Sequence, residues 1–414
     1  MRATNSIETT FRPEIREWIA ANRVPELTEL ASPEHRSVRL HLQFGAWVGG
    51  DGPLRRAWET WVGRNEGAGF VCPWWPTSAG GRGWDPVQQM IWTEELAFAQ
   101  MPRVTRGLGE HLVGPAVFLH GTDEQKDRFL PPILDGQDTY IQGFSEPDAG
   151  SDLASLRTTG VVDGDEVVIT GQKIWTTVGL VGNRMFVLCR TDPAAPPHKG
   201  ISYVLIDLEG NEHVEMRPTR QMTGDHEFTE EFLDAARAPL SNVIGGLNNG
   251  WRVTMSTLGL ERGGDATTAH LALGRMVRDV LDSMRSRGLA SDPRLRQDLI
   301  RSYIDVELMR FGGLRVGAVI ASAIAGDPGM QREIERVASA NKLIGAEVEQ
   351  RIADLAVRVQ GADALIRPDG DGYPTDPWQH ELLWSRALTI QGGSAEIQRN
   401  ILGERVLGLP REPR

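Results

Sequence analysis

The spacing of apolar residues changes twice along the chain, and this change limits the possible folds more than any other feature of the sequence. Near the start, four apolar side chains follow the spacing of one helix face: Phe11, Ile15, Trp18 and Ile19. Residues 161–169 instead form two valine-rich runs around Asp-Gly, which is typical of a β-hairpin. Helical spacing returns in residues 334–359. This order predicts an α+β protein in three parts.

We place the domain boundaries where the spacing changes. Residues 1–138 are predicted to form an all-α N-terminal domain, and residues 139–248 a middle β domain shaped as a small antiparallel sandwich or barrel. Residues 249–414 are predicted to form a C-terminal helical bundle. Its helices are expected near residues 251–287, 294–325, 330–359 and 377–390 and from about 395, with a polar loop at 361–376.

Composition and charge exclude several classes of protein. The chain has 414 residues, two cysteines and a net charge of −12. An acidic chain lacks the basic face of a nucleic-acid binder, and two cysteines exclude a disulfide framework or a Cys-rich metal site. The sequence contains no run of about 18 apolar residues, so no membrane span is predicted. Residues 1–17 lack the apolar stretch of a signal peptide. We therefore expect a cytoplasmic enzyme with no nucleic-acid partner and no metal.

The first segment that carries chemistry is residues 142–152, Gln-Gly-Phe-Ser-Glu-Pro-Asp-Ala-Gly-Ser-Asp. Glycines and small polar residues let a backbone approach a planar or anionic ligand closely, with its amides as donors. Such a loop at a sheet edge suits a flavin ring or a phosphopantetheine chain. The alternative is an ordinary Pro/Gly turn closed by an Asx-type hydrogen bond, and the residues alone leave both interpretations open.

The second segment, residues 171–177, reads Gly-Gln-Lys-Ile-Trp-Thr-Thr. A tryptophan followed by two threonines at a strand end suits the wall of a flat cofactor and hydrogen bonds to its ring. The alternative, which the segment alone favours, is a strand tryptophan that packs into the core.

The third segment, residues 258–265, reads Leu-Gly-Leu-Glu-Arg-Gly-Gly-Asp and lies in a predicted helix. Each of its two adjacent glycines weakens a helix by roughly 1 kcal/mol relative to alanine. Glu261 and Asp265 are like charges one turn apart. Neither feature favours stability, so the segment suits a close approach to a ligand, with Glu261 as a general base in a partly apolar pocket. A solvated pair of Glu261 and Arg262 is the alternative.

The fourth segment, residues 390–399, places Gly-Gly before a serine that begins a helix. The free N–H groups at such a start can bind an anion or a carbonyl, although a plain capped helix also explains the pattern. Zinc-ligand, Walker, Gly-x-Gly-x-x-Gly and Gly-x-Ser-x-Gly patterns are absent from the sequence.

Together and in this order, the four segments resemble those of the acyl-CoA dehydrogenase family. The similarity extends from about residue 8 to residue 411 and includes Gln-Arg-Asn at 398–400 and Glu-Arg-Val-Leu-Gly-Leu-Pro at 404–410. The resemblance implies an all-α N-terminal domain, a β-barrel-like middle domain and a C-terminal four-helix bundle. It also implies bound FAD, dimers or dimers of dimers, and α,β-dehydrogenation of an acyl-CoA thioester. Electrons would pass to an electron-transferring flavoprotein or a similar acceptor.

The resemblance also implies roles for individual residues. It implies FAD contacts for residues of three segments: Gln142, Phe144, Ser145, Trp175, Thr177, Ser394 and Glu396. It implies substrate contacts for Ser151, near the thioester arm, and for Gly392.

The catalytic base falls at one of two family positions. Many members carry a glutamate just before the Gly-Thr of the fourth segment, and alignment through Gln398 and Arg399 places Gly392 there, which cannot accept a proton. A minority, including isovaleryl-type and long-chain-type enzymes, carry the base on the long helix that opens the C-terminal domain. Glu261 occupies that place, so the resemblance predicts Glu261 as the base and Arg262 as the residue that orients it or organises the site.

Two departures from the family concern the adenosine end of FAD. Most members carry Arg-x-x-Phe-Gly after the long helix, where residues 285–292 read Arg-Ser-Arg-Gly-Leu-Ala-Ser-Asp. Most also carry Gln-x-x-Gly-Gly-x-Gly further on, where residues 359–364 read Val-Gln-Gly-Ala-Asp-Ala. The chain looks most like actinobacterial members, some of which share FAD sites between two different subunits.

Three function hypotheses follow from these features. The first is an FAD-dependent acyl-CoA dehydrogenase that uses Glu261, active as a homo-oligomer. The second is a subunit of a heteromer that lacks a complete FAD site of its own. The third is a relative that acts on carrier-protein thioesters or works as a flavin oxygenase. The acyl group itself does not follow from the residues, and most of the twelve tryptophans are expected in the core.

Overall fold

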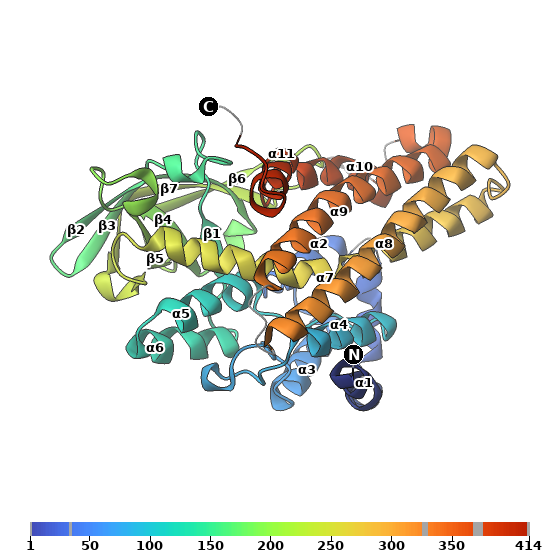
Figure 1. The fold of residues 1–414 in the computed structure, drawn as a ribbon, viewed down its shortest axis with the longest axis horizontal. Coiled ribbons are helices and arrows are strands. Elements are labelled where there is room, and N and C mark those ends of the chain that lie inside the picture. The colour runs from blue at the N-terminus through green and yellow to red at the C-terminus, as the bar shows by residue number, and fades with distance from the viewer. Residues whose placement is uncertain (1, 33–34, 325–329, 367–375, 412–414) are drawn as a thin grey trace.

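Three parts of different secondary structure follow one another along the chain (Figure 1). The computed structural model describes residues 2–32, 35–324, 330–366 and 376–411, without the side chains of residues 2–6, 257, 259–267, 317–324 and 330–338. A helical part is followed by a strand-rich part and by a second helical part, which confirms the predicted fold class. Within these residues we find no helix with the length and apolar character needed to cross a membrane.

Short helices build the N-terminal part. The α-helices are α1 (Arg2–Asn22), α2 (Arg36–Gln43), α3 (Pro53–Gly67), α4 (Pro86–Phe98), α5 (Gly114–His120) and α6 (Asp123–Leu134), with 3₁₀ turns at Pro25–Ala31 and Thr77–Ala79. Two helix starts carry capping boxes, in which side chain and backbone bond reciprocally: Asp85 with Gln88, and Thr122 with Gln125. The predicted stripe of α1 faces inward, because Ile15 and Ile19 are buried.

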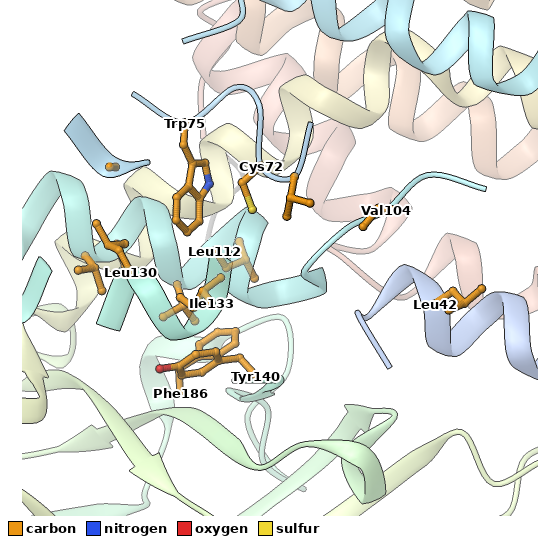
Figure 2. Close-up of a cluster of buried hydrophobic side chains, with 14 of the residues drawn as sticks. Leu42, Cys72, Trp75, Val104, Leu112, Leu130, Ile133, Tyr140 and Phe186 are labelled. Carbon is orange, nitrogen blue, oxygen red and sulfur yellow. The ribbon is translucent and has the colours of Figure 1, made fainter. Parts of the chain in front are cut away.

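Tryptophans dominate the core of this part. Trp61, Trp75 and Trp92 are fully buried, and Trp75 donates a hydrogen bond to the carbonyl of Glu110 (3.0 Å). Figure 2 shows Trp75 beside Cys72 on one side of this cluster and two rings of the strand-rich part, Tyr140 and Phe186, on the other. The helical core therefore continues onto the sheet, and these tryptophans are core residues as expected.

A π-helical turn, η4 (Gly109–Val113), precedes α5 and buries the carboxylate of Glu110 completely. This carboxylate accepts hydrogen bonds from four groups: Arg103, Thr105 Oγ1 (2.7 Å), the Arg106 N–H (3.2 Å) and Trp74 Nε1 (3.0 Å). Burial raises the pKa of Glu110, but the charge of Arg103 and the hydrogen bonds outweigh burial and lower it to about 2. The ionised carboxylate thus holds the π-helical turn, the preceding loop and Trp74 together.

One mixed sheet forms the middle part. Its strands are β1 (Tyr140–Gly143), β2 (Thr159–Asp163), β3 (Glu166–Thr177), β4 (Arg184–Arg190), β5 (Ile201–Asp207), β6 (Val214–Thr219), β7 (Phe228–Pro239) and β8 (Val243–Ile244). They follow the order β6-β7-β3-β2-β4-β5-β8, with β1 parallel to β4. The predicted hairpin is β2–β3, closed at Asp163 and Glu166 around Gly164, whose φ is +65°.

The central strand β4 is buried on both faces. Its residues Met185, Val187 and Cys189 belong to a core enclosed by β1, β3, β5 and β7, whereas Phe186 and Leu188 face the helical core. Because both faces are covered, the strand needs a continuous apolar run instead of an alternating one. The enclosed core accounts for the barrel-like character expected of this part.

The local sequence of the long strand β7 does not predict a strand. Its residues read Phe-Thr-Glu-Glu-Phe-Leu-Asp-Ala-Ala-Arg-Ala-Pro, and glutamate and alanine favour a helix over a strand. The strand forms because β7 pairs along its length with β3 and, over its first half, with β6. Tertiary pairing therefore overrides local propensity here.

Long helices form the C-terminal part: α7 (Gly250–Ser286), α8 (Pro293–Ile324) and α9 (Met330–Gln360), followed by α10 (Pro377–Trp384) and α11 (Ala395–Asn400). The first three pack along one another around one apolar core. The helix expected at 377–390 is α-helical only to Trp384 and continues as a 3₁₀ turn, Ser385–Thr389. Of the predicted loop at 361–376, Gly361–Leu365 form a 3₁₀ turn, and residues 367–375 lie outside the described part.

Candidate active site

The first predicted segment leaves the sheet at the end of β1 and turns back sharply. Glu146 and Ala149 exchange two backbone hydrogen bonds of 3.0 and 3.1 Å, which close a tight turn between them. Ser151 is exposed beyond this turn. Because β1 pairs with the buried central strand β4, the loop starts beside that strand.

Trp175 interrupts the pairing of β3 with β7. The register shifts between Ile174 and Thr176, which leaves Trp175 as an extra residue, and its φ is +66°. A bulky residue with positive φ is a backbone outlier of the kind that clusters at binding and catalytic sites. Its side chain is 57% exposed. The alternative in which Trp175 packs into the core is therefore wrong.

Two further aromatic rings connect Trp175 to the C-terminal part. The ring of Trp175 meets Phe228 edge to face at 6.0 Å, and Phe228 stacks on Trp384 of α10 at 6.0 Å. Sequence reasoning did not assign Phe228 or Trp384 to the site. Neither carries a local signal, because their contacts join β7 and α10, which are far apart in the sequence.

The structure brings the first two predicted segments together. The hydroxyl of Thr176 lies 3.1 Å from the Gln142 carbonyl, and the N–H of Ile174 donates to the Ser145 carbonyl at 3.0 Å. The loop after β1 is therefore fastened to the distorted end of β3. These contacts put Gln142 and Ser145 beside Trp175 and Thr177.

The side chains at this junction suit a ligand with a polar edge. Gln142, Ser145 and Thr177 are partly buried, and their side chains form no hydrogen bond with another residue of the described part. These partly exposed side chains bond water or a ligand, and a planar ring with polar edge atoms beside the exposed Trp175 offers them suitable partners. The isoalloxazine ring of FAD has this chemistry, so the residues fit the cofactor that the sequence predicts.

Phe144 lies differently from the other predicted cofactor contacts. Its ring is 7% exposed and packs edge to face against Phe186 (5.4 Å) and Tyr203 (6.2 Å). Because the ring is buried, only the backbone of Phe144 is left to contact a ligand. A contact between FAD and this backbone stays a prediction.

The fourth segment is held by α9. Lys342 donates to the carbonyls of Leu388 (3.0 Å) and Gly393 (2.7 Å), and Ser394 caps α11 by accepting from the Ile397 N–H (3.3 Å). Gly392 has a φ of +60°, and an added Cβ there would meet open space.

Within the described residues, no hydrogen bond or ring contact joins this segment to the loop of residues 142–152. Glu396 is exposed, and hydrogen bonds from its own N–H and from Ser394 lower its pKa. The predicted roles of Gly392, Ser394 and Glu396 therefore stay predictions.

The predicted base lies on α7. The backbone of Glu261 and Arg262 is part of this helix, whereas both side chains lie outside the described part. The helix is fixed nearby, since His120 at the end of α5 meets the hydroxyl of Ser256 at 2.6 Å, and η4 also packs against α7. The roles of Glu261 and Arg262 stay predictions.

The two segments that depart from the family at the adenosine end contact each other. Arg287, just after α7, pairs with Asp363 (2.7 Å) and donates to the carbonyl of Gln360 (3.2 Å) at the end of α9. The guanidinium of Arg287 therefore has partners within its own chain.

The comparisons with known proteins agree with this architecture. Residues 55–137, 142–233 and 248–407 match the family models for the N-terminal, middle and C-terminal domains of acyl-CoA dehydrogenases. The chain belongs to the acyl-CoA dehydrogenase family, whose members are FAD-dependent oxidoreductases acting on CH–CH bonds. Among the described residues, no group of three or more His, Cys, Asp or Glu side chains is suited to a metal ion.

Three relatives illustrate the similarity. Acyl-CoA dehydrogenase IpdE1 of Mycobacterium tuberculosis is 38% identical over 405 residues, which cover 97% of this chain and 98% of that protein. The solved structure "Tcur3481-Tcur3483 steroid ACAD" is 29% identical with a TM-score of 0.78, over 100% of this chain and 99% of that one. The ChsE4-ChsE5 complex from Mycobacterium tuberculosis is 27% identical with a TM-score of 0.75, over 100% and 99%.

Proposed function

We propose that this chain dehydrogenates an acyl-CoA thioester between its α and β carbons, with Glu261 as the base. The observation that carries the proposal is the junction of the loop 142–152 with the exposed, strained Trp175, whose neighbouring polar side chains bond no other residue in the described part of the chain. Bound FAD supplies the acceptor for the β-hydride. Glu261 takes the α-proton, and hydrogen bonds to the thioester carbonyl stabilise the developing enolate.

Each predicted residue has a task in this proposal. Trp175 covers one part of the flavin ring, while Gln142, Ser145 and Thr177 bond its polar edge. Ser394 and Glu396 contact the nucleotide part of FAD. Ser151 and Gly392 lie along the thioester, and Arg262 orients Glu261 or organises the site around it.

The purified chain gives the direct test. We expect about one FAD per chain, anaerobic bleaching of its absorbance by an acyl-CoA, and loss of turnover by roughly 10²- to 10⁴-fold in Glu261→Gln. Asp265→Asn, one turn further along the same helix, is the matched control and should keep most of the activity. Full turnover in Glu261→Gln would instead favour a flavin oxygenase.

The relatives guide the choice of acyl group. A solved relative carries the name steroid ACAD, and others act as acyl-CoA dehydrogenases of mycobacteria. We therefore expect that bulky, ring-bearing acyl-CoA thioesters bleach the flavin faster than linear ones. Activity on a loaded carrier protein but not on the CoA ester would show a carrier-protein enzyme instead.

A second candidate is a subunit of a heteromer without a complete FAD site of its own. Two observations favour it: Arg287 is paired with Asp363 where the family binds the adenosine end, and two solved relatives carry the names of two chains. Little flavin in a well-folded chain, restored when a related chain is co-expressed, would support this candidate. Reoxidation of the reduced flavin by an electron-transferring flavoprotein would identify the acceptor.

A helix face is available for association with another chain. Six large side chains on one face of α8 are each more than 40% exposed: Ile300, Tyr303, Ile304, Leu308, Phe311 and Leu314. Residues on the opposite face, such as Val306 and Met309, are buried in the bundle core. Exposed apolar surface of this extent is typical of a protein–protein interface. We propose that this stripe contacts a second subunit, either another copy or a related chain.

A further inference from the structure

A lysine is buried beneath the candidate flavin site. Lys173 lies on β3 two residues before Trp175, and its side chain has no exposed surface. Its ammonium donates to Glu146 Oε1 at 2.7 Å and to the Phe144 carbonyl at 3.2 Å. Both acceptors belong to the loop after β1. A buried ammonium is costly unless it is paired and hydrogen-bonded, which these two contacts achieve.

The partner carboxylate fixes both ends of the same loop. Glu146 begins the tight turn of the loop, and its two oxygens accept the backbone N–H groups of Arg157 (2.6 Å) and Thr158 (2.9 Å). Burial raises the pKa of Glu146, but the ammonium of Lys173 outweighs burial and holds that pKa below its ordinary value. The carboxylate is therefore ionised, and it binds the segment that returns from the loop to the sheet.

A second buried group holds the other side of the Trp175 distortion. Glu231 of β7 accepts from Thr176 Oγ1 (2.6 Å) and from the hydroxyl of Thr229. Trp175 thus lies between two buried polar contacts, Lys173 on one side and Thr176 on the other. The backbone is therefore held on both sides of the exposed Trp175 ring, at Lys173 and at Thr176.

Stability alone does not explain this arrangement. Replacing a buried ion pair by well-packed apolar side chains is often neutral or stabilising, so the pair is weak evidence for stability and its contacts to the loop point to another role. We propose that Lys173 is a positioning residue, which sets the Gln142–Ser145 loop and Trp175 at the separation that the flavin ring requires. This inference rests on the proposed FAD site and adds a residue that does not itself touch the cofactor.

The test compares three variants with the wild-type chain. Lys173→Met removes the charge at similar length, Glu146→Gln keeps the shape of the partner, and the double variant removes the pair. We expect Lys173→Met to lower kcat roughly 10- to 100-fold with less change in KM and to shift the visible spectrum of the bound flavin. The double variant should lose less than the two single losses combined, because both changes break the Lys173–Glu146 pair, although Glu146→Gln also weakens the bonds from the N–H groups of Arg157 and Thr158.

Arg237→Met is the matched control. Arg237 bonds Glu166 (2.8 Å) and Asp163 (3.0 Å) on the same sheet but is exposed. Its flavin spectrum and kcat should stay at wild-type values. If Lys173→Met fails to fold, Glu146→Gln alone still tests the idea, with a smaller shift in the same direction.

The outcomes separate this inference from the proposed function. A wild-type chain that binds FAD, together with variants whose spectrum and kcat match it, overturns the role of Lys173 and leaves the function intact. Purely additive losses in the double variant overturn the role as well, since the two residues would then act independently. A wild-type chain that binds no FAD even when FAD is added and a related chain is present overturns both.

Discussion

At the scale of single residues, the buried carboxylate of Glu110 should make the N-terminal part sensitive to acid. Its folded pKa of about 2 lies below the ordinary value of 4.5, so the folded chain binds this proton less tightly than the unfolded chain. The stabilisation is fully present above about pH 4.5 and is lost as the pH falls toward 2. The difference corresponds to about 3 kcal/mol.

Glu110→Gln should remove most of this stabilisation at pH 7. We expect the free energy of unfolding to fall by about 3 kcal/mol, because Arg103 and its neighbours lose an ionised partner. Urea unfolding followed by tryptophan fluorescence, at pH 7 and pH 4, measures both the loss and its acid dependence. Glu59→Gln removes the partner of Arg55 in an exposed pair on α3 and should lower the free energy of unfolding far less than Glu110→Gln does. Equal losses of unfolding free energy in the two variants would contradict a special role for the ionised carboxylate of Glu110.

Local sequence predicts some residues of the site and not others. The turn at Glu146 and the polar side chains at 142–152 follow from glycines and small residues that permit tight backbone turns. The strained backbone of Trp175 does not follow, since its distortion arises from pairing with a strand that local sequence fails to predict. Phe228 was missed for the same reason. For Glu261, the local residues leave a general base and a solvated pair with Arg262 both open, and the family resemblance favours the base.

At the scale of elements, the packing of α10 on α9 should weaken as the pH rises. Burial and the neighbouring carboxyl of Glu381 raise the pKa of Glu349 on α9 to about 8. The folded chain therefore holds this proton more tightly than the unfolded chain. The stabilisation is fully present below about pH 4.5 and is lost as the pH rises through 8.

Glu349→Gln should remove this pH dependence. We expect the Tm at pH 8 to rise by roughly 2–4 °C, with little change at pH 5. Thermal unfolding across pH 5 to 9, followed by circular dichroism, gives the comparison. Glu347→Gln changes an exposed residue of the same helix that pairs with Arg399, and it should leave the slope with pH as in the wild type. If the Tm of Glu349→Gln changes with pH as steeply as that of the wild type, protonation of Glu349 is not the cause.

The elements themselves were predicted to very different degrees. The long helices follow from apolar spacing and from clear breaks, so α7, α8 and α9 begin and end within two residues of expectation. Strand β7 was missed, because its glutamates and alanines favour a helix until β3 and β6 supply hydrogen-bond partners. Helix α10 ended early, at Trp384, where a 3₁₀ turn takes over.

At the scale of the whole molecule, the apolar stripe of α8 should decide the oligomeric state. Phe311 is 57% exposed at its centre, and a charge there would be costly to bury in an interface. Phe311→Glu should shift the chain toward the monomer in light scattering coupled to size exclusion. Thr60→Glu adds the same charge at an exposed position of a different helix, α3, and should leave the assembly intact. An unchanged mass for Phe311→Glu would place the interface elsewhere.

The two cysteines lie in different cores, Cys72 among the tryptophans of the first part and Cys189 inside the sheet. Burial raises the pKa of both thiols, that of Cys189 to about 12. Neither thiol can react with an alkylating reagent until the structure around it opens. Each thiol therefore reports on the opening of one part of the molecule. The alkylation rate of Cys72 reports how often the helical core opens, and that of Cys189 reports how often the sheet opens, within a single sample and with no introduced cysteine.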